Sequence, residues 1–273
     1  MSAEAESPPK SLPVRVADAV FGLPTAFIEG VGEHVRLLMQ AVAWGVRPPY
    51  RWRLLWEQCE FIGVQSVPII ALTGFFSGAV IALQSVSTLR LVQADRFTGA
   101  GLGITLAREL GPVFTSLMLT ARAASGMATE LGSMRITEQI DALTAFAVNP
   151  VQYLVSPRLL AGVIMAPLMT MIFNLVGVFG GYLVAVGLEN VDSAQFFYTM
   201  TWYTDPSDIW QGLFKAGVFG LTLTLVGSYQ GFYASGGAKG VGLATTRAVV
   251  VSSVLILCLD YFLGDVLLVV LSK

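Results

Sequence analysis

Long apolar runs divide most of the chain into segments that could each cross a membrane as a helix. A helix needs about 20 mostly apolar residues to cross the hydrocarbon core of a bilayer. Three runs that exceed this length contain no charged residue, at 61–89, 159–188 and 216–238. Two more runs, at 102–130 and 243–271, are apolar but contain charges. The pattern predicts an all-α integral membrane protein with five transmembrane helices, at about 61–89, 102–130, 155–188, 209–235 and 243–271.

The head of the chain, 1–60, carries a different pattern. Within 26–46, polar residues recur at intervals of three and four and leave apolar residues for the opposite side of a helix. These polar residues are Glu29, Glu33, Arg36 and Gln40. Pro48-Pro49 then stops the helix, and the aromatic and cationic residues of 50–56 favour the headgroup level of a membrane. We expect an interfacial helix that feeds the first span, with packing on a partner protein as the alternative.

A second amphipathic stretch, 134–147, lies between the second and third predicted spans. Its apolar and polar residues separate onto two sides of a helix, and Asn149-Pro150 ends the pattern. At ~1.5 Å per residue this helix would be about 21 Å long, which is too short to span a bilayer. It is either a lever between two spans or a cover for the base of the bundle. A further short interfacial helix is expected at 192–204, where five aromatic residues follow Asp192.

The charges of the connecting segments predict the orientation. Lys and Arg gather in the head and in the second and fourth connections, whereas the third connection, 189–208, holds four acids and no Lys or Arg. Because cytoplasmic loops carry an excess of Lys and Arg, the N-terminus should lie in the cytoplasm. An odd number of spans then places the C-terminus outside.

Composition excludes several classes of protein. The chain is 55% hydrophobic and 12% charged, against about 45–50% and about 25% in soluble domains, so a soluble or disordered protein is excluded. A net charge of −2 offers no basic field for nucleic acid. Cys59, Cys258 and His34 are too few for a disulfide framework or a Cys/His metal site, and no metal or cofactor is expected. The Gly-rich stretch 236–242 lacks P-loop spacing, and no nucleophile stands with a histidine and an acid, so the chain is not expected to be an enzyme.

Charged residues inside predicted spans point to a site, because a charge at the bilayer centre costs ~3 kcal/mol or more. Arg108 and Glu109 lie about six residues inside the outer end of the second span, and Lys215 lies equally deep in the fourth, roughly 9 Å below the surface. They either neutralise one another and join two helices, or line a pocket in which two cations and one acid leave a net positive charge for an anionic headgroup. The other charges within or at the ends of spans are interpreted as structural: Arg122, Glu130, Asp260 and Asp265.

Several collinear motifs resemble those of the MlaE/YrbE family. They are RELGP at 108–112, ELGSMRITEQIDAL at 130–143, NP at 149–150, SPR at 156–158 and ATTRAVV at 244–250. The resemblance extends over about residues 60–271. Members of this family are permease subunits of ABC transporters that move phospholipids or other lipids between bacterial membranes together with MCE-domain proteins.

The resemblance implies a homodimer in the bacterial inner membrane, in which a five-span permease domain, 61–273, follows the N-terminal segment 1–60. A lipid cavity at the dimer interface would open to the periplasm. By resemblance and depth, the lipid-binding residues are expected to be Arg108, Glu109, Lys215, Phe75 and Leu110. The helix between the second and third spans would dock on a separate cytoplasmic ATPase, and its coupling residues are expected to be Thr137, Glu138, Gln139, Asp141 and Leu143.

Two other functions remain open for the sequence. An ion- or proton-coupled secondary transporter would use Glu109, Glu130 or Asp260 as a titrating group, and its transport would respond to a pH gradient without ATP. A purely structural anchor for a periplasmic partner would carry no lipid and would tolerate loss of Glu109. The lipid species and the direction of transport are not determined by these patterns.

Overall fold

The computed structural model describes residues 12–48 and 51–271, and the side chains of 29–48, 51–267 and 269. Residues 1–11, Pro49 and Tyr50 lie outside the described residues, so the predicted cytoplasmic N-terminus and part of the aromatic run are not described. Every regular element of the described residues is helical. In chain order they are α1 (Leu12–Gly45), α2 (Trp52–Ile62), η1 (Val64–Ser66), α3 (Val67–Arg90), η2 (Asp95–Phe97), α4 (Thr98–Thr105), η3 (Leu106–Leu110), α5 (Gly111–Leu119), η4 (Thr120–Ala124), α6 (Ser125–Ile136), α7 (Gln139–Ala145), η5 (Val151–Val155), α8 (Ser156–Tyr182), η6 (Leu183–Leu188), α9 (Ser193–Tyr203), α10 (Pro206–Phe232) and α11 (Gly237–Leu271).

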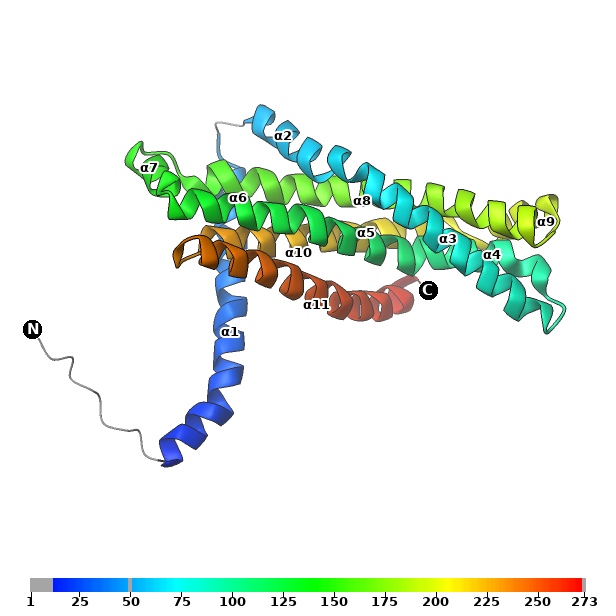
Figure 1. Cartoon of the computed structure of the whole chain (residues 1–273), viewed down its shortest axis with the longest axis horizontal. Helices are drawn as coiled ribbons and strands as arrows, with labels where there is room; N and C mark the ends of the chain where they lie inside the picture. Colours follow the sequence, from blue (N-terminus) through cyan, green and yellow to red (C-terminus); the bar gives the residue numbers. More distant parts are fainter. Residues whose placement is uncertain (1–11, 49–50, 272–273) are drawn as a thin grey trace, which may run out of the picture.

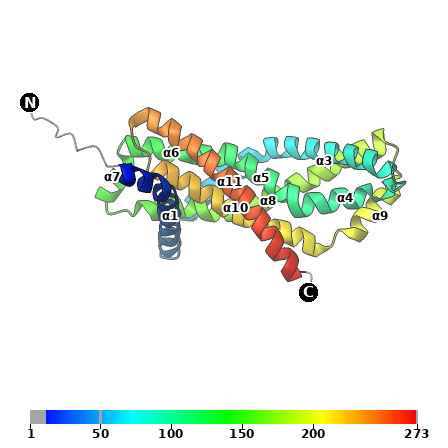
Figure 2. The ribbon, with the colours of Figure 1, turned by 90° about the horizontal axis from the view of Figure 1, so that it is seen from below.

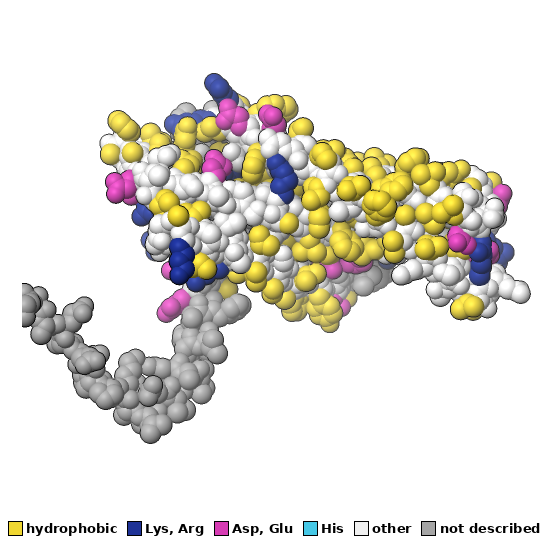
Figure 3. Space-filling view, in the orientation of Figure 1, with side chains coloured by type: hydrophobic (Ala, Val, Ile, Leu, Met, Phe, Trp, Pro, Cys, Tyr) yellow, Lys and Arg dark blue, Asp and Glu magenta, His cyan; other side chains and the backbone are white. Residues whose placement is uncertain are grey.

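Five continuous helical segments are long and apolar enough to cross a membrane, which confirms the predicted number of spans. They cover Trp52–Arg90, Asp95–Ile136, Val151–Leu188, Pro206–Phe232 and Gly237–Leu267. The spans lie side by side and alternate in direction, so that α7 lies at one end of the bundle and α9 at the other (Figure 1). Figure 3 shows a broad hydrophobic band on one face, between two ends at which charged side chains gather. The chain is therefore an all-α, multi-pass membrane protein.

The first span begins earlier than predicted. Its helix starts at Trp52, bends through the short 3₁₀ turn η1 and continues as α3. Trp52 and Trp56 are largely exposed on α2, as expected for rings that anchor a helix at the headgroup level. Trp52 and Trp56 thus lie on the helix that leads into the first span.

Helix α1 crosses the bundle at the α7 end, nearly perpendicular to the spans (Figures 1 and 2). Leu37 and Ala41 are buried against the start of the third span. The exposed side of α1 carries a row of apolar side chains: Val31, Val35, Met39, Val42 and Val46. An apolar row facing outward on a helix that lies across the spans agrees with the predicted interfacial helix.

Small residues bring the spans into close contact. A Cβ atom at Gly78 of α3 would lie 1.8 Å from the carbonyl oxygen of Gly177 on α8, so the two backbones touch directly. Cβ atoms at Gly227 and Gly231 of α10 would lie 2.9 Å and 2.8 Å from carbonyl oxygens of the second span. These pairs of small residues therefore serve packing between the spans of one chain, where van der Waals contact is the main source of helix association.

Candidate functional site

Five charged side chains form a layer between the second, fourth and fifth spans, toward the α9 end. We call this the charged layer; it consists of Arg108, Glu109, Asp208, Lys215 and Asp260. The three residues that depth alone selected from the sequence all belong to it. The structure adds Asp208 and Asp260, which the sequence analysis did not place in the site.

Lys215 of α10 is the centre of one half of this layer. Its side chain is completely buried, and its Nζ lies 2.7 Å from Oε2 of Glu109 and 3.0 Å from Oδ1 of Asp260. A Cβ atom at Gly264 of α11 would lie only 3.3 Å from Nζ, so a small residue there lets α11 approach the ammonium group. The contact between Glu109 and Lys215 matches the first of the two sequence alternatives, in which these charges neutralise one another, and Lys215 joins three spans.

Arg108 belongs to the other half, together with Asp208. The Nη2 and Nε atoms of Arg108 lie 2.6 Å and 2.8 Å from Oδ1 of Asp208. Asp208 is 3% exposed, and it also closes a capping box at the start of α10, because its Oδ2 accepts a hydrogen bond from the backbone N–H of Asp205. The sequence offered a signal for this pairing in the D-P-S-D run, which places a carboxylate on the first turn of α10, seven residues before Lys215.

The charge of the layer differs from the expectation. Three carboxylates accompany two cations, so the formal charge is −1, and the expected surplus of positive charge is wrong. Asp260, interpreted from the sequence as an end-of-span residue, is a direct partner of Lys215. The side chain of Glu109 nevertheless remains 47% exposed, so the layer is open to the outside of this chain on the Glu109 side.

A π-helical turn sets the direction of Arg108 and Glu109. Leu106–Leu110 forms the π-helical turn η3 directly before Gly111 and Pro112, and Pro112 has no N–H to donate to the carbonyl of Arg108. The N–H of Gly111 bonds instead to the carbonyl of Leu106, five residues earlier. A Cβ at Gly111 would lie 2.1 Å from Oδ1 of Asn174, so the third span approaches this turn closely. The RELGP motif thus encodes a widened turn of the kind that is frequent at functional sites.

The two apolar residues expected near these charges lie differently. Leu110 follows Glu109 directly and packs against the main hydrophobic core. Phe75 lies on α3, and its ring contacts are with Phe76 and Phe179. The carbonyl of Phe75 meets Gly180 of α8. The structure therefore places Phe75 in the contact between α3 and α8.

The segment expected to couple to an ATPase is not one helix over 134–147. Its first residues end α6, and the chain then turns at Thr137 and Glu138 before α7 begins at Gln139. Glu138 adopts a left-handed conformation, with φ of 60°, which is uncommon and strained for a residue with a Cβ. This turn was not predictable from periodicity, because neither Gly nor Pro marks it.

Contacts on both sides of the turn fix α7 to the bundle. Arg135 Nη1 lies 2.7 Å from Oδ1 of Asp141. Ile140 is buried, and Leu143 packs in the same small cluster as Leu131 and Leu154. Thr137, Glu138 and Gln139 are exposed at the tip. The result is a short helix held on one side, with polar residues presented on the other.

The remaining charges within spans serve the structure. Arg158 is 2% exposed and lies 2.8 Å from Glu130, so it ties α8 to α6. Arg122 donates to the carbonyl of Phe61 at 2.6 Å and to Oγ of Ser66 at 3.0 Å, where α2 bends into α3. The described side chains include no group of three or more His, Cys, Asp or Glu residues that could hold a metal ion.

Comparison with known proteins identifies the family of the chain. The family model described as Permease MlaE matches residues 55–265. A probable ABC transporter permease protein of Rickettsia felis is 40% identical over 252 residues, which cover 92% of this chain and 97% of the relative. The intermembrane phospholipid transport system permease protein MlaE of Haemophilus influenzae is 38% identical over 215 residues, which cover 78% of this chain and 82% of the relative. The chain belongs to the MlaE permease family.

Proposed function

We propose that the chain is the permease subunit of an ABC transporter that moves phospholipid between the inner membrane and a periplasmic MCE-domain partner. The observation that carries this proposal is the match to the phospholipid permease of Haemophilus influenzae over 78% of the chain. The subunit works as a homodimer and receives energy from a separate cytoplasmic ATPase. Its N-terminus is cytoplasmic and its C-terminus periplasmic.

The charged layer is our candidate for the lipid headgroup site. Arg108 offers a planar fork of donors and Lys215 a point charge, both suited to phosphate oxygens. Both cations already hold carboxylates, so a phosphate must replace one of them. Glu109 is the partner that can move aside, because its side chain is the most exposed carboxylate of the layer. Leu110 and Phe75 would be apolar neighbours of the acyl chains.

The transport proposal is tested by purifying the tagged protein from its own membrane. We expect an ATPase subunit and phospholipid to copurify, and the reconstituted complex to transfer labelled phospholipid only with hydrolysable ATP. A non-hydrolysable ATP analogue is the control. Lipid movement that follows a pH gradient without ATP would instead establish the secondary transporter, and a complex without lipid would favour the structural anchor.

The headgroup site is tested with Arg108→Ala, Lys215→Ala and the double variant, scoring assembled dimer and copurified phospholipid in the same preparation. We expect less lipid per intact dimer. Intact dimers with unchanged lipid in all three variants would show that the layer only joins the spans.

We further propose that α7 and the turn before it dock on the ATPase, through Thr137, Glu138, Gln139, Asp141 and Leu143. The strained backbone of Glu138 allows the role of its carboxylate to be tested without a loss of stability. In Glu138→Gly the carboxylate is lost, but glycine adopts this φ without strain, so the fold should be as stable as wild type or more so. Loss of a charge that is buried at a partner interface costs about 2–5 kcal/mol, and less at the rim.

We therefore expect Glu138→Gly to reduce ATPase copurification while the permease stays folded. Glu60→Gly is a matched control, because Glu60 is an exposed carboxylate on α2. If Glu138→Gly retained the ATPase and wild-type transport, the coupling assignment of this turn would be wrong.

A further inference from the structure

A groove of about 410 Å³ lies between the end of α1, the start of α2 and the outer faces of α8 and α10. Its volume falls within the range of ligand pockets, about 300–1,000 Å³. Two of its lining elements, the end of α1 and the start of α8, lie toward the α7 end of the bundle, whereas the start of α10, which carries Asp208 and Lys215, follows α9 at the other end (Figure 1). The two sites are therefore separate, and a ligand in the groove would bind whether or not the chain transports phospholipid.

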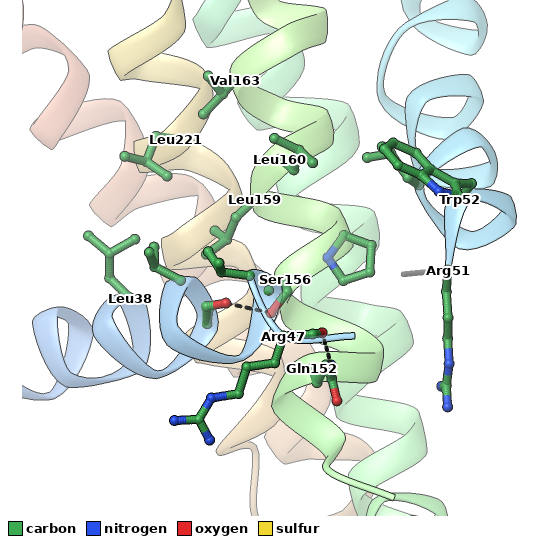
Figure 4. A pocket seen from close by; sticks show the side chains of 16 residues that line it. Leu38, Arg47, Arg51, Trp52, Gln152, Ser156, Leu159, Leu160, Val163 and Leu221 are labelled. Atoms are coloured by element: carbon green, nitrogen blue, oxygen red, sulfur yellow. Dashed lines mark hydrogen bonds between the residues drawn. The ribbon is translucent and has the colours of Figure 1, made fainter. Parts of the chain in front are cut away.

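One end of the groove is apolar and the other is cationic. Leu160, Val163 and Leu221 line the apolar end, while Arg47 and Arg51 extend past the opposite end (Figure 4). This is the polarity of a membrane lipid, in which a charged headgroup is attached to an apolar chain. The groove is thus amphipathic along its length.

The neutral polar groups of the groove already have partners. Gln152 Nε2 donates to the carbonyls of Trp44 and Arg47, at 3.1 Å and 2.9 Å. Ser156 Oγ donates to the carbonyl of Ala41 at 2.7 Å. These bonds hold the end of α1 against the third span. The guanidinium groups are left as the donors that a ligand can engage.

Neither guanidinium group is neutralised by a carboxylate. Arg47 lies over the ring of Trp44, with Cζ 4.9 Å from the centroid, and Arg51 lies over Tyr153 at 4.5 Å. Within the described residues, no acidic oxygen lies within 4.0 Å of either side chain. By contrast, the neighbouring Arg53 pairs with Glu57 at 3.0 Å. Two cations without counter-charges at the mouth of an apolar groove attract an anion that carries an apolar chain.

We propose that this groove binds one acyl chain of an anionic phospholipid of the surrounding leaflet, with the anionic headgroup attracted to the cationic end at which Arg47 and Arg51 lie. The lipid would fill the space between α1 and the third span and fix the interfacial helix to the bundle. An apolar helix of a partner protein fits the groove by shape, but it leaves the two cations without an anion. Charge complementarity therefore favours the lipid.

The test uses a phosphatidylglycerol probe with a photoactivatable group in its acyl chain, added to the delipidated full-length protein. Peptides that contain Leu160 and Val163 should be labelled. Unlabelled phosphatidylglycerol should compete, and phosphatidylcholine should compete much less. The double variant Arg47→Gln, Arg51→Gln should bind the probe at least about tenfold more weakly, since each basic residue near an anionic lipid contributes several-fold.

Two matched controls separate the site from general damage. Arg53→Gln removes a cation from the same region that already has a carboxylate partner and should bind normally. Val163→Trp should block the groove, whereas Leu175→Trp adds the same bulk to an exposed position of α8 outside it. Equal competition by phosphatidylcholine, labelling that survives Val163→Trp, or crosslinks from the groove to a partner protein in place of lipid would each overturn the proposal.

Discussion

The charged layer and the groove near α1 hold their cations in two different ways. In the charged layer, Lys215 is completely buried between two carboxylates, and Arg108 grips the buried Asp208. In the groove near α1, Arg47 lies over Trp44 and Arg51 over Tyr153. Neither side chain forms an ion pair with a described residue. Both regions contain two cations next to apolar surface. They differ in whether the protein supplies the anions.

This difference determines what a lipid phosphate would have to do. At the charged layer it must displace a carboxylate, so binding there is linked to a rearrangement of three spans. At the groove it meets cations that have no anion, so binding requires no exchange. The paired region is suited to a site that releases its ligand, and the unpaired region to a lipid that stays.

Substitution of Lys215 should lower the stability of the folded protein more than the other changes proposed below. Lys215→Met leaves Glu109 and Asp260 side by side without a cation, and breaking a buried ion pair in this way costs about 3–5 kcal/mol. We expect a markedly lower midpoint of thermal unfolding in detergent. Lys239→Met, at an exposed position, is the control and should remain within about 0.5 kcal/mol of wild type. Equal stability of the two variants would mean that the layer does not hold the spans together.

Asp208→Asn should have an intermediate effect and sharpen the comparison. The amide keeps the shape of the side chain but weakens its bond to Arg108, at a cost of about 1–3 kcal/mol. It also converts Arg108 into a cation without a carboxylate, like those of the groove. If Arg108 binds lipid phosphate, Asp208→Asn should retain more phospholipid per dimer than wild type.

The matched control for this prediction is Asp192→Asn, since Asp192 caps α9 through the backbone N–H of Gln195. It should leave lipid content unchanged. A fall in bound lipid in Asp208→Asn, with the dimer intact, would count against Arg108 as a phosphate ligand.

Arg47→Gln should have the smallest effect on stability. Because Arg47 has no carboxylate partner among the described residues, we expect the delipidated variant to unfold within about 0.5 kcal/mol of wild type. Added phosphatidylglycerol should then raise the unfolding midpoint of wild type more than that of the variant, since a ligand stabilises the state that binds it. A large loss of stability without lipid would show that Arg47 serves the fold directly.

Depth along the spans was enough to predict that Arg108, Glu109 and Lys215 lie at the same level, and their contact was one of the two alternatives that this left. The acidic partners Asp208 and Asp260 were harder to predict. A residue on another helix can be assigned as a partner only when the rotation of each helix is known. The π turn η3 adds one residue to a turn, so side chains after it no longer follow the 3.6-residue period from which faces are predicted. Asp208 was counted instead among the acids of an external loop, although it lies in the first turn of α10.

In the segment 134–147 the error of prediction concerns the secondary structure instead of the rotation of a helix. Its apolar periodicity continues through Thr137 and Glu138, and a single helix was the natural prediction. The structure breaks the helix there through a left-handed Glu138, which the pattern could not reveal because such a conformation usually requires Gly or Asn. Of the residues on the predicted apolar side, Ile140 and Leu143 do pack on the bundle, whereas Ile136 and Phe146 are exposed, and the turn that presents the polar residues was not predicted.

The long sequence separation of the ion pairs has a consequence for biosynthesis. Arg108 and Glu109 find their partners 100 and 106 residues later in the chain. At about 5–20 residues per second, the second span must wait on the order of 5–20 s after its synthesis before the fourth span emerges with the charges that neutralise it. During that interval the nascent chain holds two charges whose insertion into lipid is costly. We therefore expect the insertion machinery to shelter the second span until Asp208 and Lys215 arrive.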